Sequence, residues 1–579
     1  MLKQFRLDTY RQQQLAWWLL LVVVGVYAVE MSHQTVLRYD TFKATAFDLG
    51  NMDQVLWNTI HGRWFQFTNQ AADWYGPPTR LAIHVEPIIL LLSLLYAFHA
   101  DPRILLVFQT LALAAGAFPI FLLTRKYLPE WPLLAPLMTV VYLLSPALLG
   151  LNIFDFHPIS LATPLLLYAV LALTYKRYGW FIAACVLASA CKEDIPLTVA
   201  ILGLFVIWKY KLPRLGLTLT VGGLLWSFIA FGIVIPHFYP GAQHNNFWYR
   251  YEALGSSPGE AVVNVLLHPW LLFTTFITLD RVYYLANLFR SSGFVCVLAP
   301  EWFLMALPGL AEILLSTDPL LYSGVFHYNA AIIPFVMLAS IHGTRRLIHI
   351  WQFWYGETNN KEVAQVNLLP QVEKPLVQGN VARKIMLVLL AIETFALQWV
   401  RKMPVYVRMA AFIRGRYLAC KAWLEQQWWR LSERMRPLAR SMPVLRLQWL
   451  MFAWIVLMIG LNLVVVAPAL NAFWADHEPG SREQQIQHLL AMIPPNASVS
   501  ASSNINPHVS EREHLAVFPS ISDSGEDTSS AVQYIVVDLN TVLPEDRVAV
   551  SNELNHLRRS GQYIQIADAQ GVVLLKRRT

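Results

Sequence analysis

Long apolar runs recur along the first 344 residues and once more near residue 450, and short polar segments separate them. The first run, from Leu15 to about Glu30, follows a basic segment and lacks a good small-residue cleavage site. It predicts an uncleaved helix with a cytoplasmic N-terminus. Further runs, read as spans of about 20 residues, fall at about 104–123, 132–150, 159–175, 179–192, 195–208, 215–236, 281–291 with 294–313, 328–343 and 449–470.

Basic residues between these runs predict the orientation. Lys and Arg are enriched in cytoplasmic loops. The basic residues between the apolar runs all fall on the cytoplasmic side if Pro87–Ala97 does not cross the bilayer. That stretch is too short to span, so we expect an interfacial helix inside a long outer loop, 32–102. The count is then about eleven spans of about 20 residues. The basic residues used are Arg125, Lys126, Lys176, Arg177, Lys209, Lys211, Arg214, Arg290, Arg345 and Arg346.

The pattern divides the chain into four parts. Residues 1–344 form the transmembrane core, and 447–473 form the last transmembrane helix. Between them, 345–446 is rich in Lys and Arg with interleaved Trp, Leu and Met, which predicts amphipathic cytoplasmic helices on anionic lipid. In 474–579, helices at 483–492 and 546–559 are interspersed with β-branched runs at 498–502, 515–518, 534–538, 563–566 and 572–575. This predicts a small C-terminal α/β domain outside the cytoplasm.

Composition agrees with an all-α polytopic protein of the cell (plasma) membrane. Of the 579 residues 56% are hydrophobic and 14% are charged, against about 25% charged in soluble proteins. The four cysteines are scattered, which argues against a disulfide framework or a structural zinc site. Walker, dinucleotide-binding and HExxH motifs are absent from the sequence, so ATP-driven pumping, dinucleotide chemistry and zincin hydrolysis lack support. We expect the lipid bilayer, and no nucleic acid, as a partner.

Ionisable residues gather on the predicted outer face, where they mark candidate chemistry. The first group is Asp48 and Asp53, in the segment Phe47–Gln54 of the outer loop. Residues five apart do not share one face of a helix, but Gly50 could break the helix and let both carboxylates point to one site. The alternative is that Asp48 caps a helix that opens near Asn51.

Two similar tetrapeptides follow, His84-Val85-Glu86-Pro87 and Asp155-Phe156-His157-Pro158. Proline pushes the residue before it into an extended conformation, in which residues two apart share a side. We therefore expect each acid and histidine to converge, as metal ligands or as a base with its orienting partner. The alternative is that each proline simply starts a helix with a polar mouth.

Three further residues on that face could bind a phosphate or a head group. Lys192, in Lys192-Glu193-Asp194, could neutralise a phosphate or lie in a solvated turn. His327 could contact substrate or make an ordinary hydrogen bond at the membrane interface. Arg250 lies in an aromatic loop, 237–260, which would suit a sugar, a lipid head group or a plain aromatic belt.

Several segments together resemble a family of predicted bacterial and archaeal membrane proteins of unknown function, DUF2079. That family looks related to the GT-C superfamily of membrane glycosyltransferases. The resemblance covers most of the chain. It rests on FDLGNMDQVLWN (47–58), HVEPIILLLSLLYAF (84–98), YLLSPALLGLNIFDFHPISLATPLLL (142–167), CKEDIPL (191–197), FHYNAAIIPF (326–335), IPPNASVSASSNINPHVSEREHLAVFPS (493–520) and GVVLLKRR (571–578).

The resemblance implies transfer of a sugar from a polyprenyl-phosphate donor to an envelope acceptor at the outer membrane face. It implies Asp48 as base and Asp53 as second candidate, with His84, Glu86, Asp155 and His157 holding a divalent metal ion or the phosphate. Two departures stand out. The adjacent Asp-Glu pair of many GT-C loops is absent, and Glu86 replaces the small residue of an H-x-S-P motif.

Two alternatives from other classes stay open. The chain could be a non-catalytic membrane subunit that binds protein partners through 345–446 or 474–579. It could also transport a lipid or polymer, although regular charged residues in mid-span are few.

Overall fold

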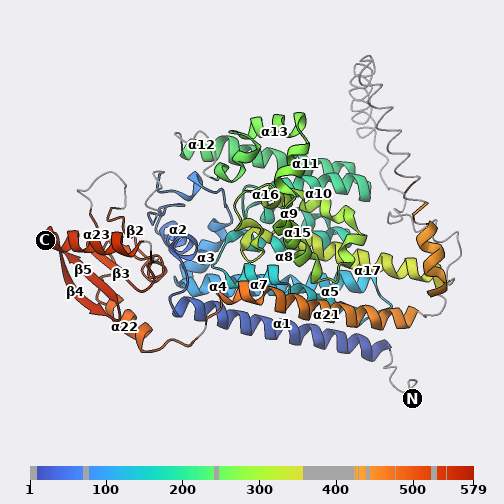
Figure 1. The fold of residues 1–579 in the computed structure, drawn as a ribbon, viewed down its shortest axis with the longest axis horizontal. Helices are drawn as coiled ribbons and strands as arrows, with labels where there is room; N and C mark the ends of the chain where they lie inside the picture. The colour runs from blue at the N-terminus through green and yellow to red at the C-terminus, as the bar shows by residue number, and fades with distance from the viewer. Residues whose placement is uncertain are drawn as a thin grey trace, which may run out of the picture. The chain divides into compact units, whose positions relative to one another are not determined.

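The computed structural model describes residues 9–69, 77–239, 247–355, 423, 426–427, 429–438, 444–475, 477–522, 531–542, 544 and 546–578. These residues are mostly helical, with one small sheet near the C-terminus (Figure 1). By contacts the chain divides into two units. The first comprises 1–207, 212–345 and 452–579, and the second comprises 208–211 and 346–451. Most of the basic insertion 345–446 lies outside the described residues.

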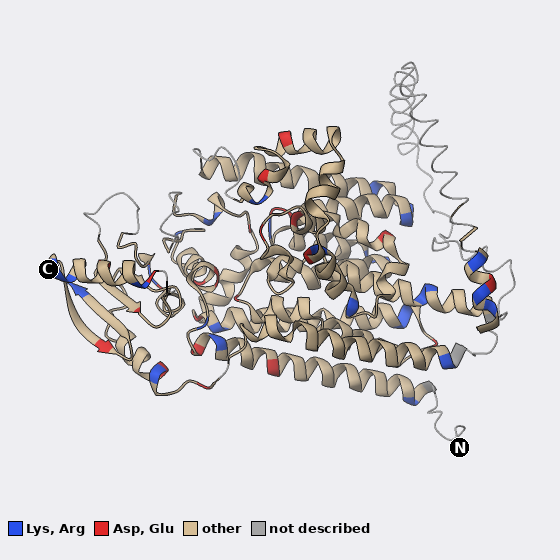
Figure 2. Cartoon of the chain, in the orientation of Figure 1, with Lys and Arg blue, Asp and Glu red and all other residues tan. Residues whose placement is uncertain are grey.

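The first unit contains nearly all helices of the core. In chain order they are α1 (Thr9–Asp40), α2 (Asn51–Ile60), α3 (Ile89–Phe98), α4 (Pro102–Ala115), α5 (Ala117–Tyr127), α6 (Leu134–Leu143), α7 (Pro146–Ile153), α8 (Ala162–Thr174), α9 (Tyr178–Ser189), α10 (Ile195–Tyr210), α11 (Pro213–Ile229), α12 (Ile235–Phe238), α13 (Pro258–Leu267), α14 (Trp270–Phe276), α15 (Leu279–Arg290), α16 (Phe303–Leu314), α17 (Ile333–Tyr355) and α21 (Val444–Asn471). Most of their length carries neither Lys, Arg, Asp nor Glu (Figure 2).

Four helical stretches among the described residues are long and apolar enough to cross a membrane. They are Tyr10–Asp40, Pro102–Tyr127, Pro213–Phe238 and Arg446–Asn471, and the bent pair α6 and α7 makes a fifth if it is one span. Shorter apolar helices occur at Ile89–Phe98, Pro158–Thr174, Tyr178–Ser189 and Ile195–Tyr210. The figure of about eleven spans therefore stays a prediction, and so does the orientation of the termini.

Two segments depart from the sequence-based elements. The expected span 132–150 is broken into α6 and α7, which meet at 47°, because Pro146 lacks the N–H that would continue the first helix. The apolar residues 258–276, which the span assignment left out, form α13 and α14. His268 and Pro269 separate these two helices, and each is too short to span alone.

The C-terminal domain has the predicted alternation of elements. Its helices are α22 (Ser481–Leu490) and α23 (Arg547–Arg559). Its strands are β1 (Val499–Ala501), β2 (Leu515–Val517), β3 (Tyr534–Asp538), β4 (Tyr563–Ala569) and β5 (Val572–Arg577). Every predicted element overlaps an observed one, because period-2 runs and amphipathic runs follow each other at short, regular distances. The predicted helices and strands of 474–579 are thus confirmed.

The sheet has the order β2-β1-β3-β5-β4. β1 pairs in parallel with β2 and β3, whereas β5 pairs antiparallel with β3 and β4. Both faces are covered by apolar clusters. One includes Ile486 of α22 and Val536, and the other includes Leu554 of α23 and Ile535. Alternate residues of β3 therefore serve opposite faces, as strand geometry requires.

Close contacts hold this domain against the outer loop of the core. The ring of His508 stacks on Tyr39 and Phe42 with centroids 4.1 and 3.9 Å away. Thr68 Oγ1 accepts from Leu515 N at 2.8 Å, and Ser510 Oγ donates to buried Asp53. The loop 41–69 thus forms one wall of the C-terminal domain.

Candidate functional site

A cavity of about 1150 Å³ opens among the residues that the sequence places on the outer face. Its walls hold Asp48, His84, His157, Lys192, Arg250 and His327 of the predicted set. Arg80, Glu193, Asp194 and Glu312 add further charge, and Phe47, Phe247, Trp248 and Tyr328 add aromatic surface. Apolar walls with a few convergent polar groups are typical of a small-molecule site.

Asp48 lies in a π-helical turn, Ala46–Gly50, that leads directly into α2. Gly50, not Asp48, occupies the N-cap position of α2, and no side chain caps this helix. The capping alternative is therefore wrong for Asp48. The turn leaves the carboxylate a quarter exposed at the cavity wall.

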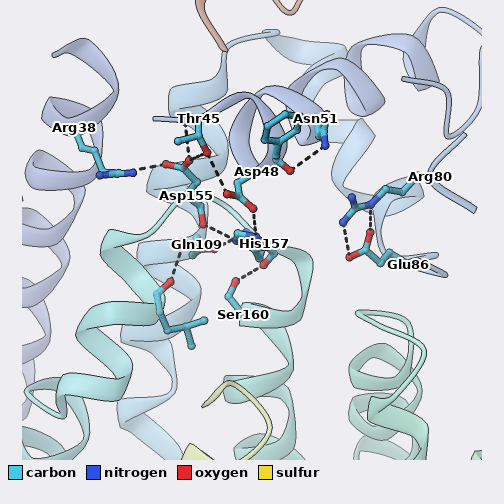
Figure 3. Close-up of polar contacts among 12 residues, drawn as sticks. Arg38, Thr45, Asp48, Asn51, Arg80, Glu86, Gln109, Asp155, His157 and Ser160 are labelled. Atoms are coloured by element: carbon cyan, nitrogen blue, oxygen red, sulfur yellow. Dashed lines mark hydrogen bonds and ion pairs between the residues drawn. The ribbon is translucent and has the colours of Figure 1, made fainter. Parts of the chain in front are cut away.

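The Asp48 carboxylate pairs with His157. Asp48 Oδ1 lies 2.9 Å from His157 Nε2, and Oδ2 lies 3.1 Å from Thr45 Oγ1 (Figure 3). Because His157 Nδ1 lies 2.9 Å from the carbonyl oxygen of Asp155, which can only accept, Nδ1 carries a proton. One further proton is therefore shared between Asp48 and Nε2.

Electrostatics place that proton on the histidine. Burial raises the pKa of Asp48, but the charge and hydrogen bond of His157 outweigh it, so this pKa lies below its usual value. Burial lowers the pKa of His157, and the carboxylate of Asp48 more than reverses this. The pair is an imidazolium and a carboxylate, and the carboxylate can accept a proton.

Supporting bonds hold His157 in place (Figure 3). Gln109 Oε1 accepts from His157 N at 3.1 Å, and Ser160 Oγ donates to His157 O at 2.7 Å. On the cavity side the ring stacks on His327, with centroids 3.9 Å apart. Burial and the nearby positive charge of His157 lower the pKa of His327 well below its usual value, so His327 is neutral. Its Nδ1 has no hydrogen-bond partner among the described residues.

The two tetrapeptides do not behave as the sequence suggested. Glu86 Oε2 accepts from Arg80 Nε at 2.7 Å (Figure 3), whereas His84 Nδ1 lies 2.8 Å from Glu193 Oε1. Asp155 accepts from Arg38 Nε at 3.3 Å and from Thr45 N at 2.8 Å. The side chain of each acid thus bonds a residue other than its neighbouring histidine. Glu86 pairs with Arg80, six positions away, and Asp155 pairs with Arg38, 117 positions away.

These four residues do not fit a metal ion as one ligand set. The oxygens of Glu86 and Asp155 are engaged by arginine and threonine donors, and both ring nitrogens of His157 are engaged as well. Among the described residues, no group of three or more His, Cys, Asp or Glu could hold a metal ion.

Asp53 lies outside the cavity. Tyr96 Oη donates to its Oδ1 at 2.6 Å, and Ser510 donates to its Oδ2. Burial, with the charge of Glu511, raises the pKa of Asp53 well above its usual value. The second catalytic candidate is therefore a buried link between the outer loop and the C-terminal domain.

Lys192 and Arg250 are the predicted cations of the cavity. Lys192 Nζ lies 3.3 Å from Glu312 Oε1 and 3.6 Å from Asp194 Oδ1, and its side chain is 11% exposed, so it is not in a solvated turn. Arg250 Nε lies 3.1 Å from Asp318 Oδ2, with Phe247 and Tyr328 beside the guanidinium. The loop around Arg250 thus lines the cavity, although residues 240–246 lie outside the described part of the chain.

The two carboxyl groups in the turn 192–194, those of Glu193 and Asp194, have pKa values shifted in opposite directions. Burial raises the pKa of Glu193, but His84 and Lys192 lower it to about 2. Burial, together with the charges of Glu312 and Glu193, raises the pKa of Asp194 to about 7 despite Lys192. Such separation of neighbouring carboxyl groups is common at functional sites.

Several contributors were missed from the sequence, chiefly Arg38, Thr45, Arg80, Glu312 and Asp318. Arg38 carried a usable signal, since a basic residue at the predicted outer end of the first span runs against the positive-inside tendency. Glu312 lies 120 positions from Lys192 in the sequence, and local patterns contain no record of such a pair. Arg80, in contrast, is only six positions from its partner Glu86.

The described residues form a mostly helical protein with several helices long and apolar enough to cross a membrane, a cavity lined in part by the segment before α2, and a small sheet near the C-terminus. A family model described as "Predicted membrane protein (DUF2079)" matches residues 38–380 and 417–574. The chain belongs to this family, as the sequence motifs indicated. No match is found among curated proteins.

Two solved structures, both of ArnT from Cupriavidus metallidurans, are similar over most of their length. The crystal structure in the apo state aligns with a TM-score of 0.44 at 12% identity, covering 96% of this chain and 96% of that chain. The crystal structure bound to undecaprenyl phosphate aligns with a TM-score of 0.38 at 11% identity, covering 96% and 97%.

Proposed function

We propose that the chain is a GT-C-type membrane glycosyltransferase. It moves a sugar from a polyprenyl-phosphate donor to a hydroxyl of an envelope acceptor, at the outer face of the membrane. The observation that carries the proposal is the ionised Asp48, held by His157 at the wall of a cavity of about 1150 Å³.

Each side of the reaction has a candidate group. Asp48 takes the proton of the acceptor hydroxyl, whose oxygen attacks the anomeric carbon of the donor sugar. The bond between that carbon and the phosphate oxygen breaks, and the phosphate leaves with the extra negative charge. Lys192 and Arg250 line the same cavity and stabilise that charge.

The remaining walls suit the donor. Phe47, Phe247 and Trp248 offer apolar surface for a prenyl chain or a sugar face, and Asn51 and Tyr328 add polar side chains to the same lining. Because the four metal candidates each bond a protein group, no step of this mechanism runs through a metal ion.

The test uses a strain that lacks the gene and lipid extracts analysed by mass spectrometry. Loss of a polyprenyl-phosphate glycosyltransferase should lead to accumulation of its donor lipid, and the wild-type gene should reverse it. Asp48→Asn should fail to reverse it while expressing normally, since a general base contributes about 10²–10⁴-fold. The matched control is Asp53→Asn, the same change outside the cavity, which should restore the normal lipid profile.

Either of two results would overturn the proposal. One is an unchanged profile of prenyl-linked sugars on deletion, and the other is full restoration by Asp48→Asn. Full restoration would favour the alternative of a non-catalytic membrane subunit, in which the paired charges of the cavity serve structure only.

A further inference from the structure

A second cavity, of about 670 Å³, lies in the C-terminal domain. Its floor is formed by residues that follow the ends of β1, β2 and β3, and one side by α23. Lys43, Ala44 and Thr45 of the outer loop close the opposite side. Its volume lies within the roughly 300–1,000 Å³ usual for small-molecule sites.

The position of this cavity follows from the sheet. β1, β2 and β3 are the parallel strands, and they end at Ala501, Val517 and Asp538. Loops diverge at the carboxyl edge of such strands, and ligands of open α/β sheets bind there. The loops are already held: Asn504 Nδ2 donates to Asp538 Oδ2 at 3.0 Å, and Thr541 Oγ1 donates to Asn504 Oδ1 at 3.1 Å.

The lining indicates the chemistry of the ligand. Hydroxyl and amide groups come from Ser502, Ser503, Asn504 and Thr541, and apolar surface comes from Phe518, Pro519, Val542 and Val550. A sugar ring presents both kinds of surface, hydroxyls at its edge and C–H groups on its faces. Among the charged lining residues, the carboxylates of Asp546 and Glu553 face the single ammonium of Lys43, which donates to Trp474 O at 3.1 Å. An anionic ligand would meet net repulsion.

The second cavity is joined to Asp48 by a short path. Ser503, on its wall, accepts from Ala46 N at 3.3 Å, at the start of the turn that carries Asp48. Thr45, also on the wall, lies 3.1 Å from Asp48 Oδ2 through its hydroxyl. A ligand group that bonds the Thr45 hydroxyl would therefore be linked through that hydroxyl to Asp48, the residue that pairs with His157.

We propose that this second cavity binds a non-phosphorylated saccharide unit of the acceptor and so positions the acceptor beside Asp48. The role as an acceptor site rests on the proposed function, whereas saccharide binding at this place does not. The path through Ser503 and Thr45 then couples occupancy of the cavity to the turn that holds the base.

The test is saturation-transfer NMR on the full chain in lipid nanodiscs. The probes are methyl glucoside, methyl galactoside and methyl N-acetylglucosaminide, each compared with the matching 6-phosphate sugar. At least one methyl glycoside should show saturation transfer, and its 6-phosphate should show less. Ala549→Trp fills the cavity and should abolish the signal. The matched control is Val548→Trp, the same insertion at the neighbouring position of α23, where Val548 is 70% exposed and outside the lining.

Three results would overturn the proposal. The first is no transfer to any methyl glycoside, and the second is equal transfer in the two tryptophan variants, which would place the sugar elsewhere, including the Asp48 cavity. The third is stronger transfer to the 6-phosphates, which would indicate an anion site. Asp48→Asn separates this idea from the proposed function, because it should abolish glycosyl transfer yet leave the methyl glycoside signal intact.

Discussion

His157 Nε2 and Asp48 Oδ1 lie 2.9 Å apart, and the opposite ring nitrogen of His157 is fixed on the carbonyl oxygen of Asp155. The residues are 109 positions apart in the sequence, yet they share one proton. The imidazolium of His157 holds the pKa of Asp48 below its usual value.

His157→Asn should move the acidic limb of the profile of kcat/KM against pH to higher pH. In the wild type, His157 holds the pKa of Asp48 below its usual value, so the base stays ionised as the pH falls. Without the imidazolium, burial dominates and that pKa rises, so protonation inactivates the enzyme sooner. The measurement is the rate of glycosyl transfer across pH in nanodiscs. An acidic limb at the same pH in His157→Asn and wild type would contradict the assignment of Asp48 as the base.

Asp194 should make donor binding depend on pH near neutrality. Its pKa is raised to about 7, so the carboxyl is neutral at pH 6 and gains a negative charge at pH 8. That charge lies in the cavity beside Lys192 and opposes a phosphate. KM for the donor should rise from pH 6 to pH 8 in the wild type and stay level in Asp194→Asn. A pH-dependent KM that persists in the variant would assign the titration to another group.

The buried pair of Arg80 and Glu86 should behave as a unit. Both side chains are under one tenth exposed, so removing one partner leaves an uncompensated charge. Arg80→Met or Glu86→Leu alone should cost about 3–5 kcal/mol of stability, and the double variant should recover much of it. Thermal unfolding in detergent, followed by tryptophan fluorescence, measures the stability of the wild type, the two single variants and the double variant. Simple addition of the two single effects would contradict a coupled pair.

Asp53 should control the attachment of the C-terminal domain, not catalysis. Asp53→Ala leaves the hydroxyls of Tyr96 and Ser510 without their acceptor and should cost about 1–3 kcal/mol. Because folding raises the pKa of Asp53, the stability that this group contributes is present at low pH and is lost as pH rises through the folded-state pKa. Asp53→Asn should remove that loss. The measurement is the rate of proteolysis within residues 474–579 at pH 5 and at pH 8, in the wild type and in Asp53→Asn. The same change of that rate with pH in both proteins would contradict this account.

The sequence by itself determined the local elements. Apolar runs and the alternation in 474–579 depend on neighbours along the chain, so the mostly helical character of the core and every helix and strand in 474–579 could be predicted. The break at Pro146 and the helices α13 and α14 were not predicted. The basic loops and the span count predicted that the candidate residues share one face, and six of the nine line one cavity.

Only the tertiary structure decided which of these residues work together. Asp48 and Asp53 are five positions apart, yet one faces the cavity and the other binds Tyr96 and Ser510, because a π-helical turn rotates the first away from α2. His84 and Glu86 share a segment but pair with Glu193 and Arg80. Burial makes an unpaired charge costly, so each group pairs with a partner that lies close in space. For His84 that partner, Glu193, lies 109 positions away in the sequence, and for Glu86 it lies only six positions away.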